Sequence, residues 1–321
     1  MNNLTDTQKK IIRILFAESE SSRSILANKL SLTNAALTLT IKPLLEKGML
    51  IEMKRDVQRV GRKELLISLN KDFGYFIGVD IRKHHFYFSL MDFSGKLVDF
   101  AVDKDISFDE FIAPHKEKLL AIGVTVRGQA SMDILKEKYP EFVNIIENFN
   151  LPIYLFNNVD CLADIYALNH PEDKNFLLVK YGPGVGSSIY VYGKPLGSLS
   201  ELGHTYYQDK TVEETISYSA ILGKELEEEE ANEEILQHPE KLEYVLHVLS
   251  FALLNADSLL SLQKIILSGA LLSNEETKVK LNEELNKLNS NFDCSKLCVY
   301  PDYQTYNEIK SCIGAFNKLF R

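Results

Sequence analysis

The side chains best suited to binding a polar ligand end one segment of the chain, residues 176–204. The last four residues of this segment are Glu201, Leu202, Gly203 and His204. A carboxylate and an imidazole three residues apart, held by a glycine turn, can both hydrogen-bond the hydroxyl groups of a ligand in one cleft. The segment therefore predicts a binding site for a polar ligand.

Two strands are expected to position these residues. The apolar run Phe176–Val179 predicts a buried strand, and Ser187–Tyr192 predicts a second strand after a turn through Gly182, Gly184 and Gly186. Taken alone, the segment is equally well explained as an ordinary hairpin with a glycine-rich turn.

The composition is that of a globular protein with room for about two domains. The chain has 321 residues, of which 45% are hydrophobic and 25% charged. No apolar run approaches the roughly 20 residues that a membrane helix needs. The first ten residues are polar and have no apolar core of a signal peptide. We therefore expect a cytoplasmic location and no membrane partner.

The four cysteines, Cys161, Cys294, Cys298 and Cys312, are expected to be free thiols in the core. Cys294 and Cys298 are spaced C-x-x-x-C, but no second pair lies nearby to complete a zinc site. We predict no metal site and no cofactor.

The net charge of −9 is unevenly distributed. Residues 1–65 carry 12 Lys and Arg against 7 Asp and Glu, whereas the remainder is strongly acidic. A basic head on an acidic body indicates that only the head contacts a polyanion such as DNA.

The basic head has the pattern of a helix-turn-helix. Helices are expected over residues 5–18, with Thr5 as a candidate cap, and over Arg23–Leu30, after a serine-rich break at Glu20–Ser22. A third helix is expected from an N-terminal cap at Thr33 onward. The third helix is the expected recognition helix, with Asn34 and Thr38 contacting bases. Pro43 predicts a kink or a restart in this helix, because proline costs about 3 kcal/mol in a helix interior.

Two predicted strands follow, residues 49–55 and 63–70, and between them lies the basic segment Asp56–Arg62. This is the pattern of a β-wing, in which Arg59, Arg62 and Lys63 would contact the DNA backbone or the minor groove. An ordinary solvated hairpin is the alternative. From Gly74 onward, strands and helices alternate, which predicts an α/β fold.

In their order along the chain, these segments resemble the ROK family (repressors, open reading frames, kinases). GRKELLISLN is similar to the wing and following strand, and GVDIRKHHFYFSLMDFSG to the first phosphate segment. LPIYLFNNVDCLA resembles the segment that carries the catalytic aspartate. YGPGVGSSIYVYG followed by SELGH resembles the second glycine loop and the sugar-binding Glu-x-Gly-His motif.

The resemblance implies a winged helix-turn-helix over residues 1–70. It implies that residues 71–321 form a sugar-sensing domain with two lobes of an actin-like, ribonuclease-H-type fold. The partners it implies are operator DNA and a small sugar or sugar-phosphate effector. Because a palindromic operator matches two-fold symmetry, we also expect a homodimer or homotetramer.

The departures from the family pattern argue against catalysis. Active kinases of the family have Asp-x-Gly-Gly-Thr in the first phosphate segment, but here Asp80 is followed by Ile-Arg-Lys-His. Their catalytic aspartate is replaced by Asn158, and an amide cannot act as a general base. Asp160 would substitute for it only if the turn were rebuilt.

The resemblance also assigns the ligand site. Asn157, Asn158, Glu201 and His204 are the expected sugar-binding residues. The family's cysteine-rich zinc cluster is absent after His204, which leaves this histidine either for ligand contact or for a structural role.

Three functions follow from these patterns. The first is a DNA-binding transcriptional regulator, a repressor, controlled by a sugar that binds to a catalytically inactive kinase-like domain. The second is an active ATP-dependent sugar kinase with a fused DNA-binding head. The third is a winged helix used for protein interaction, followed by an empty scaffold.

Overall fold

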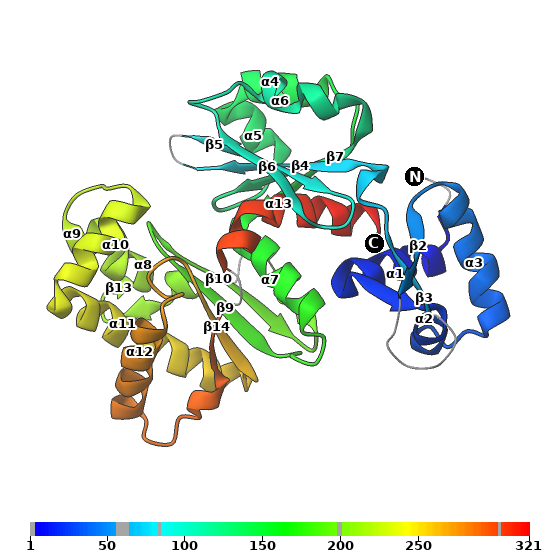
Figure 1. Cartoon of the computed structure of the whole chain (residues 1–321). Coiled ribbons are helices and arrows are strands. Elements are labelled where there is room, and N and C mark those ends of the chain that lie inside the picture. Colours follow the sequence, from blue (N-terminus) through cyan, green and yellow to red (C-terminus); the bar gives the residue numbers. More distant parts are fainter. Residues whose placement is uncertain (1–3, 56–63, 83–84, 198–200, 301–302) are drawn as a thin grey trace. The chain divides into compact units, whose positions relative to one another are not determined.

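The computed structural model describes residues 4–55, 64–82, 85–197, 201–300 and 303–321. The chain divides into two compact units, the first formed by Met1–Asn158 with Glu308–Arg321 and the second by Val159–Asn307. Each unit combines helices with a mixed sheet, so the predicted mixed α/β class is confirmed (Figure 1).

The first unit begins with three helices and a three-stranded antiparallel sheet of order β1-β3-β2 (Figure 1). The elements are α1 (Asp6–Glu18), β1 (Glu20–Ser22), α2 (Arg23–Lys29), α3 (Asn34–Glu46), β2 (Leu50–Arg55) and β3 (Glu64–Leu69). α1 and α2 both contact α3, and the three helices bury Ile11, Leu15, Leu26, Leu37 and Ile41 completely or almost completely.

Side-chain caps determine where these helices begin. Thr5 forms a capping box with Gln8 at the start of α1, and the Thr33 hydroxyl accepts a hydrogen bond from the Ala36 amide at the start of α3. Both predicted caps are confirmed.

Two details of this region differ from the expectation. Glu20–Ser22, expected to be a break, forms β1 because it pairs with Leu66–Ser68 of β3. α3 does not restart at Pro43 but continues through it. Proline removes the bond to the carbonyl of Leu39, and Leu39 is exposed, so water can replace the missing donor.

A five-stranded sheet forms the rest of the first unit, with the order β6-β5-β4-β7-β8. Its strands are β4 (Tyr75–Ile81), β5 (Phe86–Asp92), β6 (Leu97–Val102), β7 (Leu119–Val126) and β8 (Ile153–Asn157). β4, β5 and β6 are antiparallel neighbours, whereas β7 runs parallel to β4 and β8 parallel to β7.

Helices cover both faces of this sheet. They are η1 (Lys71–Phe73), α4 (Phe108–Ile112), η2 (Ala113–Lys118), α5 (Met132–Lys138), α6 (Pro140–Glu147) and α13 (Tyr303–Leu319). Ile77 and Val79 of β4 pack in the cluster that includes Phe108 and Phe142. The alternate residue Gly78 faces α13, where an added Cβ would lie 2.7 Å from the Cys312 sulfur.

The sheet of the second unit has the order β11-β10-β9-β14-β15, with the same pattern of parallel and antiparallel neighbours. Its strands are β9 (Phe176–Tyr181), β10 (Val185–Val191), β11 (Lys194–Pro195), β14 (Lys264–Ser268) and β15 (Leu297–Val299). The predicted hairpin of Phe176–Val179 and Ser187–Tyr192 is present as β9 and β10.

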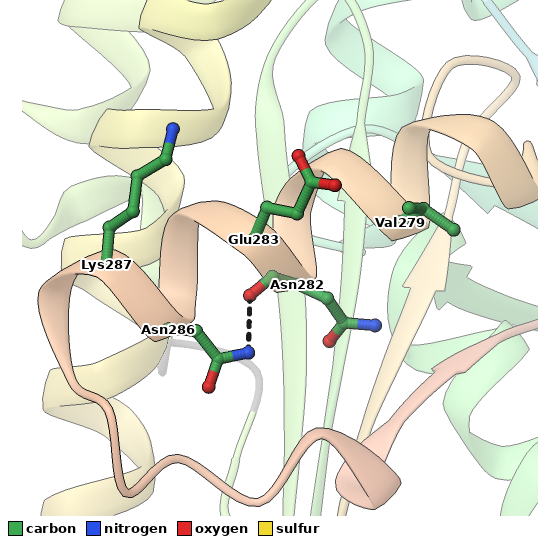
Figure 2. A pocket seen from close by; sticks show the side chains of 5 residues that line it. All are labelled: Val279, Asn282, Glu283, Asn286 and Lys287. Carbon is green, nitrogen blue, oxygen red and sulfur yellow. Dashed lines mark hydrogen bonds between the residues drawn. The ribbon is translucent and has the colours of Figure 1, made fainter.

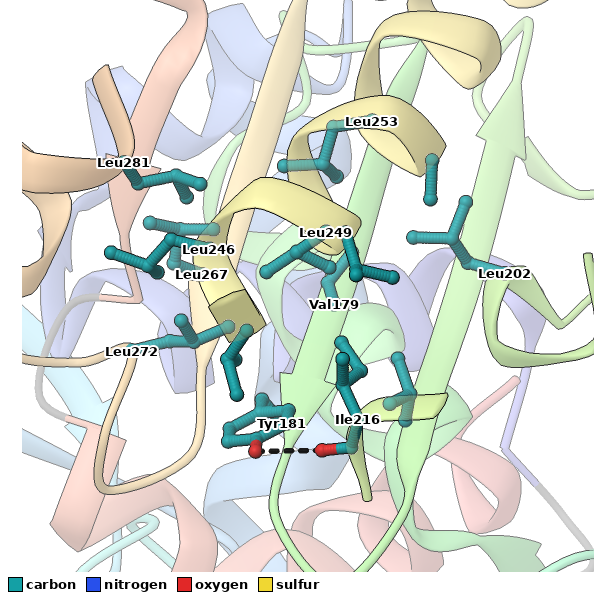
Figure 3. Close-up of a cluster of buried hydrophobic side chains, with 14 of the residues drawn as sticks. Val179, Tyr181, Leu202, Ile216, Leu246, Leu249, Leu253, Leu267, Leu272 and Leu281 are labelled. Atoms are coloured by element: carbon teal, nitrogen blue, oxygen red, sulfur yellow. Dashed lines mark hydrogen bonds between the residues drawn. The ribbon is translucent and has the colours of Figure 1, made fainter. Parts of the chain in front are cut away.

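Alternation along β9 separates two apolar layers in the second unit. Leu177, Val179 and Tyr181 pack with α11 in the large cluster of Figure 3, while Phe176 and Leu178 pack on the α7 side. The other elements are α7 (Asn158–Asn169), η3 (Leu202–His204), β12 (Tyr206–Tyr207), β13 (Lys210–Thr211), α8 (Val212–Ile216), α9 (Tyr218–Leu222), α10 (Glu228–Gln237), α11 (Pro239–Leu260), α12 (Glu275–Leu288) and η4 (Cys294–Lys296).

All four cysteines are free. Cys161 and Cys312 are buried, whereas Cys294 and Cys298 are half-buried rather than fully in the core. Within the described part of the chain, no helix is both long enough and apolar enough to cross a membrane.

Candidate functional site

The exposed side of α3 is one candidate site. Asn34 and Thr38 are exposed and lie one helical turn apart, and Leu39 beside them has 73% of its surface exposed. Leu37 and Ile41, which lie three residues after Asn34 and Thr38, are fully buried in the core. The helix therefore presents short polar side chains at the border of its buried face, and the apolar side chain of Leu39 further from that border.

Arg23 at the start of α2 fixes the position of Thr38. Its Nη1 donates to the Thr38 hydroxyl at 3.0 Å, while its Nε and Nη2 donate to Glu52 Oε1 of β2, the first at 3.1 Å. The Thr38 hydroxyl donates in turn to the Asn34 carbonyl at 2.8 Å. One guanidinium thus connects α2, α3 and β2.

The three basic residues predicted to contact the DNA backbone, Arg59, Arg62 and Lys63, lie outside the described residues. The flanking strands pair up to Arg55 and Glu64. The wing contacts of the three basic residues stay a prediction.

A second candidate site is built around η3 in the second unit. Leu202 packs in the core and its amide donates to Ser187 Oγ at 2.6 Å. At Gly203, a Cβ would lie 2.1 Å from the Val185 carbonyl oxygen, so only glycine allows η3 to approach β10 this closely. These contacts hold Glu201 and His204 on either side of the anchored residues, and Glu201 Oε2 lies 3.4 Å from His204 Nε2.

Further carboxylates surround Glu201. Burial raises the pKa of Glu201 above its ordinary value of 4.5; His204 opposes this shift, and the negative charges of Glu213 and Asp160 add to it. Burial likewise raises the pKa of Asp160, while a hydrogen bond with Ser188 of β10 lowers it. The second unit therefore gathers carboxylates and hydroxyls that suit hydrogen bonds to a polyhydroxylated ligand.

Several of the carboxylates and hydroxyls near Glu201 were not predicted from the sequence. Glu213 accepts a hydrogen bond from the Val185 amide at 2.8 Å, and Ser187 and Ser188 come from the middle of β10. Serines in a strand carry no local signal of function, because only the approach of η3 and α7 to β10 gives them a role.

The two predicted asparagines lie in the first unit. Asn157 ends β8, is 9% exposed, and its Nδ2 donates to the Gly128 carbonyl at 2.9 Å. Asn158 is the first residue of α7. Glu201 and His204 belong to the second unit. The expected convergence of all four residues on one ligand stays a prediction.

Asp80, at the position of the first phosphate segment, is held in an ion-pair network inside the first unit. Its Oδ2 accepts from Lys310 Nζ of α13 at 2.8 Å and from Arg82 Nε at 2.9 Å, and its Oδ1 accepts from the Thr125 hydroxyl at 2.8 Å. Lys310 is completely buried. Two cations therefore already pair with this carboxylate.

Two other groupings are less suited to a sugar. Figure 2 shows a surface hollow lined by Val279, Asn282, Glu283, Asn286 and Lys287, all from α12. A sugar site needs groups that converge from several elements, and this hollow has one helix. His170, Glu172 and Asp173 lie close enough together to hold a cation, but Asp173 already accepts from the Tyr166 hydroxyl.

No protein-family model matches the chain. The xylose repressor of Caldicellulosiruptor bescii is 23% identical over 227 residues, which cover 61% of this chain and 57% of that repressor. The xylose repressor of Bacillus subtilis is 22% identical over 228 residues, which cover 61% of this chain and 59% of that protein. The chain thus matches less than two thirds of the length of these relatives.

Solved structures share the fold. A ROK family transcriptional regulator, described as a homologue of the E. coli MLC protein, superposes with a TM-score of 0.69 at 16% identity, over 94% of this chain and 93% of that one. A ROK hexokinase from Thermus thermophilus superposes with a TM-score of 0.59 at 14% identity, over 76% of this chain and 99% of that one. In sequence the chain is similar to xylose repressors and in fold to ROK family proteins, and the resemblance predicted from its motifs is confirmed.

Proposed function

We propose that the chain is a DNA-binding transcriptional repressor controlled by a sugar or a sugar derivative. In this proposal, residues 1–70 form a winged helix-turn-helix, and α3 reads the major groove through Asn34 and Thr38. The observation that carries the proposal is the exposed face of α3, which offers polar groups on a rigid helix. The similarity to xylose repressors and to a ROK family transcriptional regulator supports it.

The effector is proposed to be a small polyhydroxylated molecule. Carboxylates accept hydrogen bonds from sugar hydroxyls, and Glu201 lies on a turn that Leu202, Gly203 and Ser187 hold in place. His204 is 65% exposed in its side chain and can donate or accept beside Glu201. Asn157 and Asn158 complete the proposed site. Their amides suit the same task because each can donate and accept.

The kinase-like fold is proposed to bind the sugar without catalysing phosphoryl transfer to it. Asn158 cannot take a proton from an attacking hydroxyl. Arg82 and Lys83 stand at the two positions where kinases of the family have glycines, and Asp80 itself is paired with Lys310 and Arg82. Both observations support a sensor rather than an enzyme.

The two sheets support the proposed actin-like, two-lobed arrangement of residues 71–321, because both have the same strand order. In this arrangement, a sugar that closes the two lobes would change the spacing of paired DNA-binding heads. A sensor requires such a coupling between two sites.

DNA binding is tested by selecting fragments from a random-sequence library with the purified chain and titrating salt against the best fragment. We expect sequence-dependent binding that weakens steeply with salt. Arg62→Ala should lower the slope of log K against log salt by about 0.9 if Arg62 contacts a phosphate. If the chain selects no sequence at low salt, the proposed DNA recognition is refuted. That result would favour the third hypothesis, in which the winged helix binds another protein.

Effector binding is tested by a thermal-shift screen of sugars and sugar phosphates, followed by DNA-binding assays with each compound that stabilises the chain. Glu201→Ala should abolish the sugar response and leave DNA binding by the unliganded chain nearly unchanged. The effector part of the proposal fails if every sugar leaves both the melting temperature and the DNA affinity unchanged.

The alternative is an active ATP-dependent sugar kinase, and one observation favours testing it. Asp160 lies in the first turn of α7, two residues after Asn158, and its raised pKa is a property of general bases. A kinase would phosphorylate a sugar from the same panel with ATP, and Asp160→Asn would remove that activity. We expect no phosphorylation by the natural chain or by Asn158→Asp.

A further inference from the structure

The hydrogen bonds around Thr38 determine where its hydroxyl proton points. A guanidinium can only donate and a carbonyl oxygen can only accept. Because Arg23 Nη1 lies 3.0 Å from the Thr38 hydroxyl, the hydroxyl accepts from Arg23. Because the Asn34 carbonyl lies 2.8 Å away, the hydroxyl donates its one proton to that carbonyl. The proton is therefore directed into the helix and not toward the exposed face.

What Thr38 can offer a base follows from this arrangement. A hydroxyl has one proton and two lone pairs, and here the proton and one lone pair are already used. The remaining lone pair can only accept a hydrogen bond. In the major groove, the bases that present a donor are adenine, through its N6 amino group, and cytosine, through its N4 amino group.

We propose that Thr38 selects an adenine or a cytosine at one position of each half-site, and that Arg23 is the positioning residue that imposes this choice. The inference rests on the proposed function, since it specifies what α3 reads once it lies in a groove. Glu52 maintains the arrangement, because both its charge and its hydrogen bonds hold the guanidinium beside Thr38.

Without Arg23, the Thr38 side chain could turn about its Cα–Cβ bond, because threonine has two χ1 rotamers in a helix. In the second rotamer the hydroxyl leaves the Asn34 carbonyl, and its proton is available for guanine O6 or thymine O4. With Arg23 present, the same change of rotamer would also break the bond from Nη1. A Thr38 hydroxyl without Arg23 could contact a base that presents a donor or a base that presents an acceptor. Arg23 restricts this hydroxyl to accepting a hydrogen bond.

The experiment compares the sequences selected from a random library by the full-length chain and by four variants. The natural chain should prefer adenine or cytosine at one half-site position by about five-fold, the value of one neutral hydrogen bond of about 1 kcal/mol. Thr38→Val should remove this preference, and Thr38→Ser, which keeps the hydroxyl, should retain it. Arg23→Ala should reduce the preference to less than two-fold by admitting guanine or thymine at that position.

Thr40→Val is the matched control, because Thr40 lies on the same helix and donates to its own i−4 carbonyl, that of Ala36, at 2.9 Å. It should leave every base preference unchanged. A second readout separates positioning from direct phosphate contact, since a phosphate contact by Arg23 would lower the salt slope by about 0.9 in Arg23→Ala. We expect an unchanged slope.

Each other outcome overturns a defined part of the inference. If Thr38→Val keeps the adenine or cytosine preference, Thr38 does not read the base. If Arg23→Ala keeps the preference and lowers the salt slope, Arg23 binds phosphate and is not a positioning residue. If the natural chain selects no sequence at all, the proposed function fails, and the inference fails with it. Melting temperatures of all variants show whether each one is folded.

Discussion

Lys310 is a buried cation whose partner lies 230 residues away in the sequence. Its Nζ donates to Asp80 at 2.8 Å, and its side chain is completely buried. Removing one partner of a buried pair leaves an uncompensated charge, which typically costs about 3–5 kcal/mol. Arg82 also pairs with Asp80 and compensates part of this loss.

We therefore predict that Lys310→Met lowers the free energy of unfolding by about 3 kcal/mol, at the low end of that range. Adding Asp80→Asn should recover part of this loss. The measurement is urea unfolding of both variants. Lys280→Met is the control, because Lys280 pairs with Glu276 on the exposed surface and should change stability by at most about 1 kcal/mol. A loss no larger than that of the control would show that the buried pair contributes little.

Glu201 gives a second residue-scale prediction, through pH. Burial raises the pKa of Glu201 in the folded chain above 4.5, so the folded state holds the proton more tightly than the unfolded state. The resulting stabilisation is complete below the unfolded pKa and is lost as pH rises through the folded pKa. At pH 7, Glu201→Gln should therefore raise the melting temperature, and the difference should shrink below about pH 4.5.

Glu214 is the matched control with the opposite sign. Hydrogen bonds with Thr211 at the start of α8 lower the pKa of Glu214 below 4.5. Glu214→Gln should thus lower the melting temperature at pH 7, and this difference should vanish as pH falls through the folded pKa. Melting curves between pH 3 and pH 7 test both signs, and equal pH dependence of the two variants would contradict the assignment.

At the scale of elements, η3 depends on one glycine. A Cβ at Gly203 would lie 2.1 Å from the Val185 carbonyl oxygen, so η3 would have to move away from β10. Gly203→Ala should cost about 1–3 kcal/mol, a typical value for overpacking, and should abolish stabilisation by the effector because Glu201 moves with η3.

Gly182→Ala in the turn between β9 and β10 provides the comparison. Its added Cβ would lie 3.7 Å from the flexible carboxylate of Glu228, which is an ordinary contact. We expect a small change in melting temperature and an unaltered response to effector. A Gly203→Ala variant that still responds to the effector would separate the position of η3 from ligand binding.

At the scale of the whole molecule, we predict an even-numbered oligomer, a homodimer or a homotetramer. One winged helix contacts few base pairs, whereas two heads related by a two-fold axis match the two halves of a palindromic site. Sedimentation at micromolar concentration, with and without DNA, measures the state. A monomer under both conditions would contradict the prediction.

The sequence by itself determined the local elements. Caps such as Thr5 and Thr33, apolar runs, and apolar residues at helical spacing act over a few residues and predicted the helices of residues 4–46 and the strand β9 closely. Ordered motifs also predicted the resemblance to the ROK family. Elements with weak sequence patterns were not predicted. One of them is β1, because its serines favour a break between helices and it becomes a strand only by pairing with β3.

Tertiary structure decided which distant groups meet. The bond from Lys310 to Asp80 and the contact of Arg23 with Thr38 and Glu52 have no local signal, because each joins residues from separate elements. The repeated strand order is also invisible in the sequence, since it depends on which strands exchange hydrogen bonds and not on which residues they contain. Short-range patterns thus specified the helices and strands of this protein, and long-range packing set the charge environment of Asp80 and the direction of the Thr38 proton.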